Sequence, residues 1–321
     1  MSTYNIINIR EILYSVGDMN KVSEFFEGYG GWNRVGRYET SRHTMQFWNL
    51  PDSCTAEEIL IQSHHVPNGQ IRLIKFNNID QKHIRSSQQP WDTGGIMDIN
   101  LRVHEVESSF DALREMGFHG LSDPLCQEMG QFKLYDCLMK GYDDTIIAFT
   151  HRLKPPMDLP APIKLPTHVY KTTITVKNLA EAKSFYTDIL GCDVLSEYSV
   201  KKDSPQENMF GLPFNLADKV SCNAVILSIH GGKDTDFQIV EFDGVSGKDF
   251  SDRAMPPHRG FVLYRVEVEN IAEYYREIQM KGGKIHNQMT EMQVEPYGNV
   301  QCFSVKSPNG VLWEFFESKE A

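Results

Sequence analysis

An alternating pattern of apolar and polar positions, followed directly by a helical pattern of period 3.6, occurs four times along the chain. In each copy the alternating segment ends in Val, and an acidic or amide residue stands two positions later, where helix N-caps are common. Further alternating segments follow each helix, including 43–48, 58–62 and 72–76 in the first copy. Each copy is therefore predicted to form a strand, a helix and three more strands. The four strand-to-helix segments are 11–18, 98–105, 171–178 and 263–270.

Aromatic residues and glycines show that the copies alternate in type. The first and third copies share an aromatic pair at equivalent helix positions, 25–26 and 185–186. The second and fourth copies have a single aromatic residue at an earlier helix position, Phe110 or Tyr275, and a glycine after the helix, Gly117 or Gly282. Such a glycine suits the helix C′ position, which favours a positive φ. The chain is thus predicted to contain a duplicated half of two units.

A proline-rich segment separates these halves. Residues 154–166 carry prolines at a density that neither a helix nor a central strand tolerates. We therefore expect an N-terminal domain at 1–152, a linker at 153–166 and a C-terminal domain at 167–321. A length of 321 residues agrees with two domains of ordinary size.

Charge and composition exclude several classes of partner. With 43 acidic and 32 basic residues the formal net charge is −11, and no basic run is present, so nucleic acid is not an expected partner. The first residues show no signal-peptide pattern, and no apolar run approaches 18 residues, so no membrane partner is expected. Six scattered cysteines without a CxxC pair predict reduced thiols and a cytoplasmic location.

The four-unit pattern, together with the segment SPNGVLWEF at 307–315, resembles the vicinal oxygen chelate superfamily. This superfamily includes glyoxalase I, extradiol dioxygenases, fosfomycin- and bleomycin-resistance proteins and methylmalonyl-CoA epimerase. The resemblance implies an α+β fold of four βαβββ modules in two tandem domains, whose curved sheets form concave half-barrels around a small molecule. It also implies a divalent metal such as Fe, Mn, Zn, Ni or Mg, which binds neighbouring substrate oxygens as a Lewis acid.

The superfamily takes its metal ligands, usually His and Glu, from the first and last strands of each module. Only Glu314 keeps the expected residue type in this chain, and none of the carried-over positions is His. The ligand set is therefore expected to be degenerate, with Glu314 and Gln238 as the remaining candidate metal ligands. The first-strand positions are Glu11, Asp98, Lys171 and Leu263, and the last-strand positions are Arg72, Ala148, Gln238 and Glu314.

Grouping these positions by half of the chain gives two hypotheses. In the first half, Glu11, Arg72 and Asp98 are expected to form an ionic cluster, because a guanidinium stays protonated and binds no metal. The alternative is that Arg72 holds a carboxylate of the ligand in a bidentate contact. In the second half, Glu314 is the candidate general base and Lys171 its electrostatic partner. Burial would raise the pKa of Glu314 and a cation would lower it, and the sequence leaves this balance open.

Alternation places further polar side chains on the same strand faces as these positions. In an antiparallel sheet such a polar face commonly meets solvent, which is the alternative interpretation. In a half-barrel, however, the solvated concave face is the binding cavity. The candidate ligand-binding residues are Glu11, Arg72, Asp98, Thr173, Gln238, Arg265 and Glu267.

These observations favour an enzyme that acts on an oxygenated organic molecule by lyase or isomerase chemistry. A non-catalytic binding protein of the bleomycin-resistance type is one alternative. An extradiol dioxygenase is another, although its ferrous site would need two His residues at positions where none stands. The expected partner is a small molecule, and the resemblance also allows a homodimer.

Overall fold

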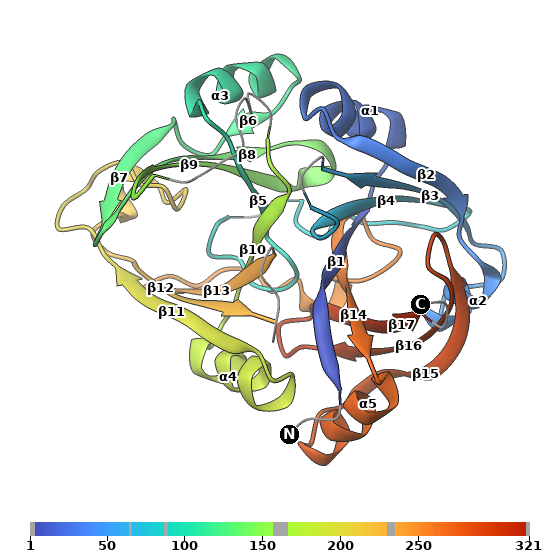
Figure 1. The fold of residues 1–321 in the computed structure, drawn as a ribbon. Coiled ribbons are helices and arrows are strands. Elements are labelled where there is room, and N and C mark those ends of the chain that lie inside the picture. Colours follow the sequence, from blue (N-terminus) through green and yellow to red (C-terminus); the bar gives the residue numbers. More distant parts are fainter. Residues whose placement is uncertain (1–3, 64–65, 87–88, 157–165, 230–234, 319–321) are drawn as a thin grey trace.

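Two curved sheets form the body of the protein in the computed structural model (Figure 1). The structure describes residues 4–63, 66–86, 89–156, 166–229 and 235–318, so most of the expected linker lies outside the described residues. Four βαβββ units follow one another, which confirms the predicted α+β class. No helix in the described part of the chain is long and apolar enough to cross a membrane.

The first sheet has eight strands in the order β15-β16-β17-β14-β1-β4-β3-β2. It therefore joins the first unit of the chain to the fourth. The strands of the first unit are β1 (Asn5–Ser15), β2 (Asn33–Glu39), β3 (Thr55–Gln62) and β4 (Gln70–Asn77). The strands of the fourth unit are β14 (Gly260–Glu269), β15 (Ile285–Val294), β16 (Gly298–Lys306) and β17 (Leu312–Ser318).

The second sheet has nine strands in the order β11-β12-β13-β10-β5-β9-β8-β6, with β7 paired to β8. It joins the second unit to the third. The strands of the second unit are β5 (Asp98–Arg102), β6 (His119–Gly120), β7 (Leu125–Met129), β8 (Phe132–Lys140) and β9 (Ile146–Lys154). The strands of the third unit are β10 (Val169–Thr175), β11 (Asp193–Val200), β12 (Ser221–Ser228) and β13 (Asp236–Asp243).

The antiparallel pairs at the centre of each sheet decide which units share a concave face. Strand β1 pairs with β14, with Glu11 opposite Arg265, and β10 pairs with β5, with Thr173 opposite Asp98. The expected grouping of site residues by half of the chain is therefore wrong. The grouping failed because sequence similarity between units shows that they share a fold, but it does not show which strands pair across units. The boundaries drawn at 152 and 167 stay a prediction.

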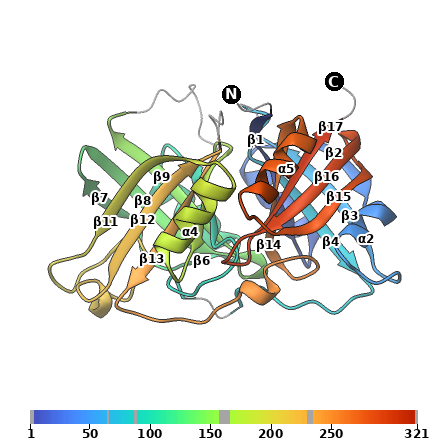
Figure 2. The same cartoon turned by 90° about the horizontal axis from the view of Figure 1, so that it is seen from below.

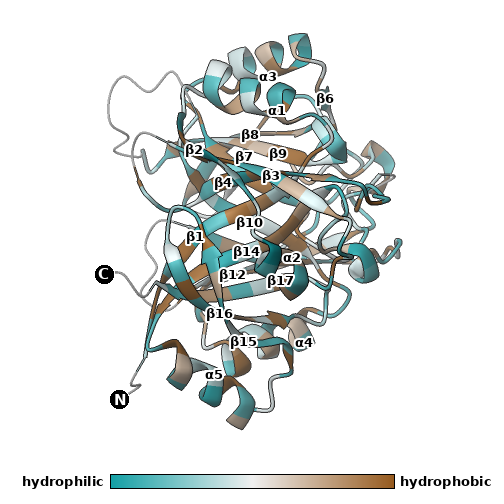
Figure 3. Cartoon of the chain, turned by 90° about the vertical axis from the view of Figure 1, so that its right-hand side faces the viewer, coloured by the Kyte–Doolittle hydropathy of each residue, from teal (hydrophilic) through white to brown (hydrophobic). Residues whose placement is uncertain are grey.

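The helices lie at the two ends of the seam between the sheets. Helices α1 (Met19–Glu24) and α3 (Val106–Glu115) lie together at one end (Figure 1). Helices α4 (Leu179–Ser184) and α5 (Ile271–Met280) lie at the other (Figures 1 and 2). One hydrophobic core runs between them and includes the convex-face residues of both sheets. Hydrophobic segments run through the interior strands, and hydrophilic stretches mark the outer helices (Figure 3). The concave faces consequently point away from this core.

The helix starts agree with the predicted capping at two of the four units. Asp18 accepts hydrogen bonds from the backbone amides of Asn20 and Lys21, both at 3.1 Å, and Asn178 caps α4. Glu105 makes no side-chain cap, and the start of α5 is capped instead by Glu317 of β17. The predicted positive φ after α3 and α5 is confirmed at the two glycines, Gly117 (89°) and Gly282 (81°).

Removing the cap of α1 should cost stability. Asp18→Ala is expected to lower the free energy of unfolding by about 1 kcal/mol, because two backbone amides lose their acceptor. Glu105→Ala is the matched control, since Glu105 accepts no hydrogen bond from a helix amide. Urea unfolding measures both variants, and an equal loss in the two would contradict the capping role of Asp18.

The prediction of a strand at 43–48 is wrong, because this segment is helical. Residues Arg42–Phe47 form helix α2, which Ser41 caps by accepting from the amide of Thr44. Three apolar residues at its end, Met45, Phe47 and Trp48, are buried on the concave side of the first sheet. The apolar positions mimic strand alternation over this short stretch, and the cap together with tertiary packing selects the helix. Helix α2 therefore fills the space that a ligand would need.

Candidate functional site

The concave face of the first sheet is filled by a buried ionic cluster. Arg72 donates from Nε to Glu11 Oε2 and from Nη1 to Glu58 Oε2, both at 2.6 Å. Arg265 donates to Glu11 at 3.0 Å and to Glu314 at 2.6 Å. Glu11, Arg72 and Glu314 are each 0% exposed. The first pair, Glu11 with Arg72, confirms part of the expected ionic cluster.

Two arginines of this cluster pair with three carboxylates, those of Glu11, Glu58 and Glu314. Burial alone would raise the pKa of Glu11, but the charges of Arg72 and Arg265 lower it to about 2. The second oxygen of Glu314 accepts from Trp48 Nε1 at 2.9 Å. Every charged group here therefore has a partner and none is more than 6% exposed, which is the arrangement of a structural network. Glu314 fits this structural role better than that of a general base.

Several predicted contacts are absent from this face. Asp98 and Lys171 belong to the second sheet, so neither the Glu11–Arg72–Asp98 cluster nor the Lys171–Glu314 pair exists. The guanidinium of Arg72 is already used by Glu11, Glu58 and the backbone oxygen of Glu295, which leaves no group to hold a ligand. The remaining prediction concerned Glu267, which is half-buried and pairs with Arg10.

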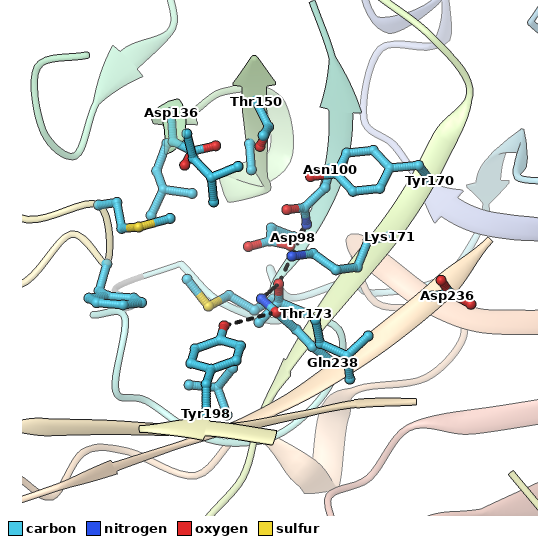
Figure 4. Close-up of a pocket in the computed structure, with 18 of the residues that line it drawn as sticks. Asp98, Asn100, Asp136, Thr150, Tyr170, Lys171, Thr173, Tyr198, Asp236 and Gln238 are labelled. Atoms are coloured by element: carbon cyan, nitrogen blue, oxygen red, sulfur yellow. Dashed lines mark hydrogen bonds between the residues drawn. The ribbon is translucent and has the colours of Figure 1, made fainter. Parts of the chain in front are cut away.

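The concave face of the second sheet holds an open cavity of about 340 Å³. Strand alternation turns Asp98 and Asn100 of β5, Lys171 and Thr173 of β10, and Gln238 of β13 into it (Figure 4). This face collects Asp98, Thr173 and Gln238 from the predicted ligand-binding residues, together with Lys171. Its side chains therefore form the candidate functional site.

Hydrogen bonds orient the polar wall of this cavity. Gln238 donates from Nε2 to Thr173 Oγ1 at 2.9 Å and accepts at Oε1 from Tyr198 at 3.2 Å (Figure 4). Asn100 donates to Asp98 Oδ1 at 2.6 Å. Both amide side chains are thereby fixed, which presents a defined polar surface to a ligand.

Asp136 of β8 is a site residue that sequence reasoning missed. It is 7% exposed, lines the cavity, and its Oδ2 atom has no hydrogen-bond partner in the described part of the chain. On the same face of β8, the neighbouring inward residues Leu134 and Leu138 are apolar, so the signal in the sequence was a lone acidic residue among apolar ones. That this face meets a cavity depends on the partner strands, which the sequence does not identify.

Two carboxyl groups of this cavity titrate near neutral pH. Burial raises the pKa of Asp98 to about 6, although Thr173, Lys171 and Asn100 oppose the shift. Burial likewise raises the pKa of Asp136 to about 6, opposed by a hydrogen bond from Thr150 and by the charge of Lys171. The ammonium of Lys171 therefore acts electrostatically on both carboxyls. Groups with such pKa values can accept and return protons under physiological conditions.

The residues at the superfamily's ligand positions do not fit a divalent metal in this cavity. Those positions are occupied by Asp98, Ala148, Lys171 and Gln238, which all line the cavity. Ala148 has no donor atom, and an ammonium repels a cation. No group of three or more potential metal ligands occurs among the described residues. Gln238 and Glu314, the predicted metal ligands, lie on different sheets and cannot share one ion.

Comparison with known proteins agrees with the fold. Residues 168–315 match the family model of the Glyoxalase/Bleomycin resistance protein/Dioxygenase superfamily. A variant of glyoxalase I from Zea mays is similar at 13% identity with a TM-score of 0.66, covering 98% of this chain and 94% of that chain. The glyoxalase I structure itself gives 12% identity, a TM-score of 0.63, and coverage of 98% and 93%.

A candidate dioxygenase from Bacillus subtilis is also similar, at 10% identity with a TM-score of 0.54, covering 99% of this chain and 87% of that chain. A search of curated proteins returns no significant match. At these identities the structural likeness concerns the fold, and it confirms the resemblance expected from the sequence. The chemistry of this protein depends on the residues of its own cavity.

Proposed function

We propose that the open cavity of this chain, whose residues 168–315 match the Glyoxalase/Bleomycin resistance protein/Dioxygenase superfamily, binds an oxygenated organic molecule and transfers a proton on it, in a reaction of the isomerase or lyase type. One observation carries this proposal. Asp136 presents a buried carboxylate oxygen without a partner to the same cavity as Lys171, and its pKa is about 6. A carboxyl group with this pKa is half ionised at about pH 6 and mostly ionised at neutral pH, which suits a general base that also has to return its proton.

The roles of the side chains follow from their chemistry. Asp136 Oδ2 takes a proton from the carbon next to the substrate carbonyl, the C–H electron pair forms a C=C bond, and the π pair of the carbonyl moves to its oxygen. The ammonium of Lys171 stabilises the oxyanion that forms, as a preorganised charge does in other enolising sites. Return of the proton to a neighbouring atom completes an isomerisation, whereas loss of a leaving group completes an elimination. Asp98, held by Asn100, is the second carboxyl available for this return.

Deuterium exchange tests the proposed proton transfer. The probes are hydroxyacetone, hydroxyacetone phosphate and phenylpyruvate in D₂O, followed by proton NMR. We expect exchange of the hydrogen next to the carbonyl above the buffer rate with at least one probe, and its loss in Lys171→Met. Binding of a probe without any exchange would contradict the proposal and favour a binding protein.

A binding protein remains the second candidate because much of the cavity wall is apolar. Phe132, Phe210 and Phe242 line it alongside several aliphatic residues. Such a wall holds an organic molecule by burial without any chemistry. The exchange experiment separates the two functions, since a binder would retain the ligand unchanged.

The charge of Lys171 should control the acidity of the cavity. Lys171→Met is expected to raise the pKa of both Asp98 and Asp136, because the charge that opposes the effect of burial is lost. Lys171→Arg keeps the charge and is the control. Carboxyl ¹³C NMR titration measures the pKa values, and unchanged values in Lys171→Met would show that its ammonium lies too far away to act.

The residues at the superfamily's ligand positions predict the metal content of the purified protein. Protein prepared without chelator is expected to contain no stoichiometric divalent metal, because Ala148 and Lys171 stand at two ligand positions of the open cavity. Inductively coupled plasma mass spectrometry measures this. Stoichiometric iron or manganese would contradict this prediction and reopen the dioxygenase alternative.

A further inference from the structure

A second, smaller pocket of about 130 Å³ lies where strands β5 and β9 end. Arg102, Thr150 and Arg152 line both this pocket and the main cavity, so the two spaces adjoin. Two histidines, His104 and His151, complete its basic lining, with ring centroids 6.3 Å apart. Among the described residues that line it none is acidic, although the whole protein carries a net charge of −11.

The basic groups of this pocket, here called the basic pocket, have hydrogen-bonding capacity to spare. Arg152 Nε and His104 Nε2 are both buried and have no hydrogen-bond partner in the described part of the chain. Arg152 Nε is always a donor, and His104 Nε2 is a donor in the tautomer that carries the proton there. A buried donor without a partner costs free energy, which an acceptor supplied by a ligand would recover. The positions of these two atoms therefore indicate an acceptor-rich ligand group.

The basic groups of the basic pocket lie close enough to lower one another's pKa. Burial lowers the pKa of Arg102, and the neighbouring charge of Arg152 lowers it further, while Tyr170 and Asp236 oppose the shift. Burial and the proximity of His104 also lower the pKa of His151. A bound anion would relieve this repulsion between basic groups.

We propose that the basic pocket is a phosphate subsite, which holds the phosphate group of a small phosphorylated molecule whose carbonyl end reaches Asp136 and Lys171. The proposal rests on the proposed function for the role of these two residues. Two guanidinium groups match the double charge of a phosphate, and two imidazole rings add hydrogen-bonding nitrogens for its several oxygens. A carboxylate would be satisfied by one guanidinium.

The strand register sets the size of this molecule. Arg102 of β5 pairs with Thr150 of β9, which in turn pairs with Asp136 of β8. The backbones of Arg102 and Asp136 are therefore separated by two strand spacings, about 10 Å in total. Side chains reach inward from both, so a molecule of a few carbon atoms with a terminal phosphate spans the gap.

Calorimetric titration with inorganic phosphate tests the subsite without any need for turnover. The protein should bind phosphate, and Arg152→Gln should weaken this binding by about tenfold or more, since a charge-assisted contact is lost. His104→Gln should weaken it by a smaller factor. Arg276→Gln is the matched control, because Arg276 is a largely exposed arginine of α5 and its loss should leave binding unchanged.

The outcomes separate this proposal from the proposed function. Absence of phosphate binding, equal binding in Arg152→Gln and Arg276→Gln, or binding of acetate without phosphate would each overturn the subsite. Asp136→Asn should keep phosphate binding, so the subsite stands even if proton transfer fails. Arg152→Lys should restore phosphate binding, and the variants should keep the melting temperature of the parent protein. These two results together would show that the weaker binding of Arg152→Gln does not come from misfolding. In the exchange assay, hydroxyacetone phosphate should have a KM about tenfold or more below that of hydroxyacetone.

Discussion

Asp136→Asn is expected to lower the rate of deuterium exchange by about 10²- to 10⁴-fold, because the variant keeps the shape of the side chain but has no base. The same substitution should leave the protein folded and raise its stability at neutral pH. Burial holds the pKa of Asp136 at about 6, so its ionisation costs the folded state about 3 kcal/mol at neutral pH. A gain in stability together with a loss of activity is typical of a residue kept for function.

The pH dependence of this gain gives a second readout. The stability that a raised carboxyl pKa gives the folded state is fully present below the unfolded value of about 4 and is lost as pH rises to about 6. The stability difference between Asp136→Asn and the parent protein should therefore grow between pH 4 and pH 6 and stay constant above. Thermal unfolding at several pH values measures it.

Asp123→Asn provides the matched control for both readouts. Asp123 is exposed in the loop after β6, so its amide variant should change neither exchange nor the pH profile of stability. If Asp136→Asn and Asp123→Asn behave alike in the exchange assay, Asp136 is not the base and the proposed mechanism is wrong.

Arg72→Met should destabilise the protein by about 3–5 kcal/mol, because Glu11 and Glu58 would remain charged and buried with their main partner removed. The exposed pair Arg37 with Glu57 supplies the comparison, and Arg37→Met should cost no more than about 1 kcal/mol. Urea unfolding measures the two losses. Similar small losses would show that the cluster does not hold the first sheet together.

The same cluster predicts a loss of stability in acid. The arginines lower the pKa of Glu11 to about 2 in the folded protein, against an ordinary value of 4.5. Its stabilising contribution is present above about pH 4.5 and is lost as pH falls towards 2. Arg72→Met should reduce this acid dependence, because Glu11 would then lose its nearest guanidinium.

The superfamily's ligand positions are buried in the first sheet and line an open cavity in the second. In the first sheet they hold Glu11 and Glu314, each bonded to an arginine and sealed beneath α2 and Trp48. In the second sheet the first-strand positions hold Asp98 and Lys171 and the last-strand positions hold Ala148 and Gln238, all beside an open cavity. One half-barrel is therefore closed by paired charges and apolar packing, and the other keeps charged groups in contact with a binding space.

The sequence alone determined the local features of this protein. Its periodicity identified four units, the positive φ at Gly117 and Gly282, and the caps at Asp18 and Asn178, because these depend on residues close along the chain. The ligand positions implied by the superfamily resemblance included Asp98 and Gln238, and alternation added Thr173; all three line the cavity.

Only the tertiary structure decided which units share a sheet and which concave face is open. Pairing of β1 with β14 and of β5 with β10 joins residues far apart in sequence, and periodicity carries no information on the partner of a strand. For the same reason the role of Asp136 depends on the tertiary structure, which brings β8 to the same cavity as Lys171. The burial of Glu314 likewise depends on the packing of α2 and Trp48 over it. Local sequence sets which face of a strand is polar, whereas long-range packing decides what that face meets.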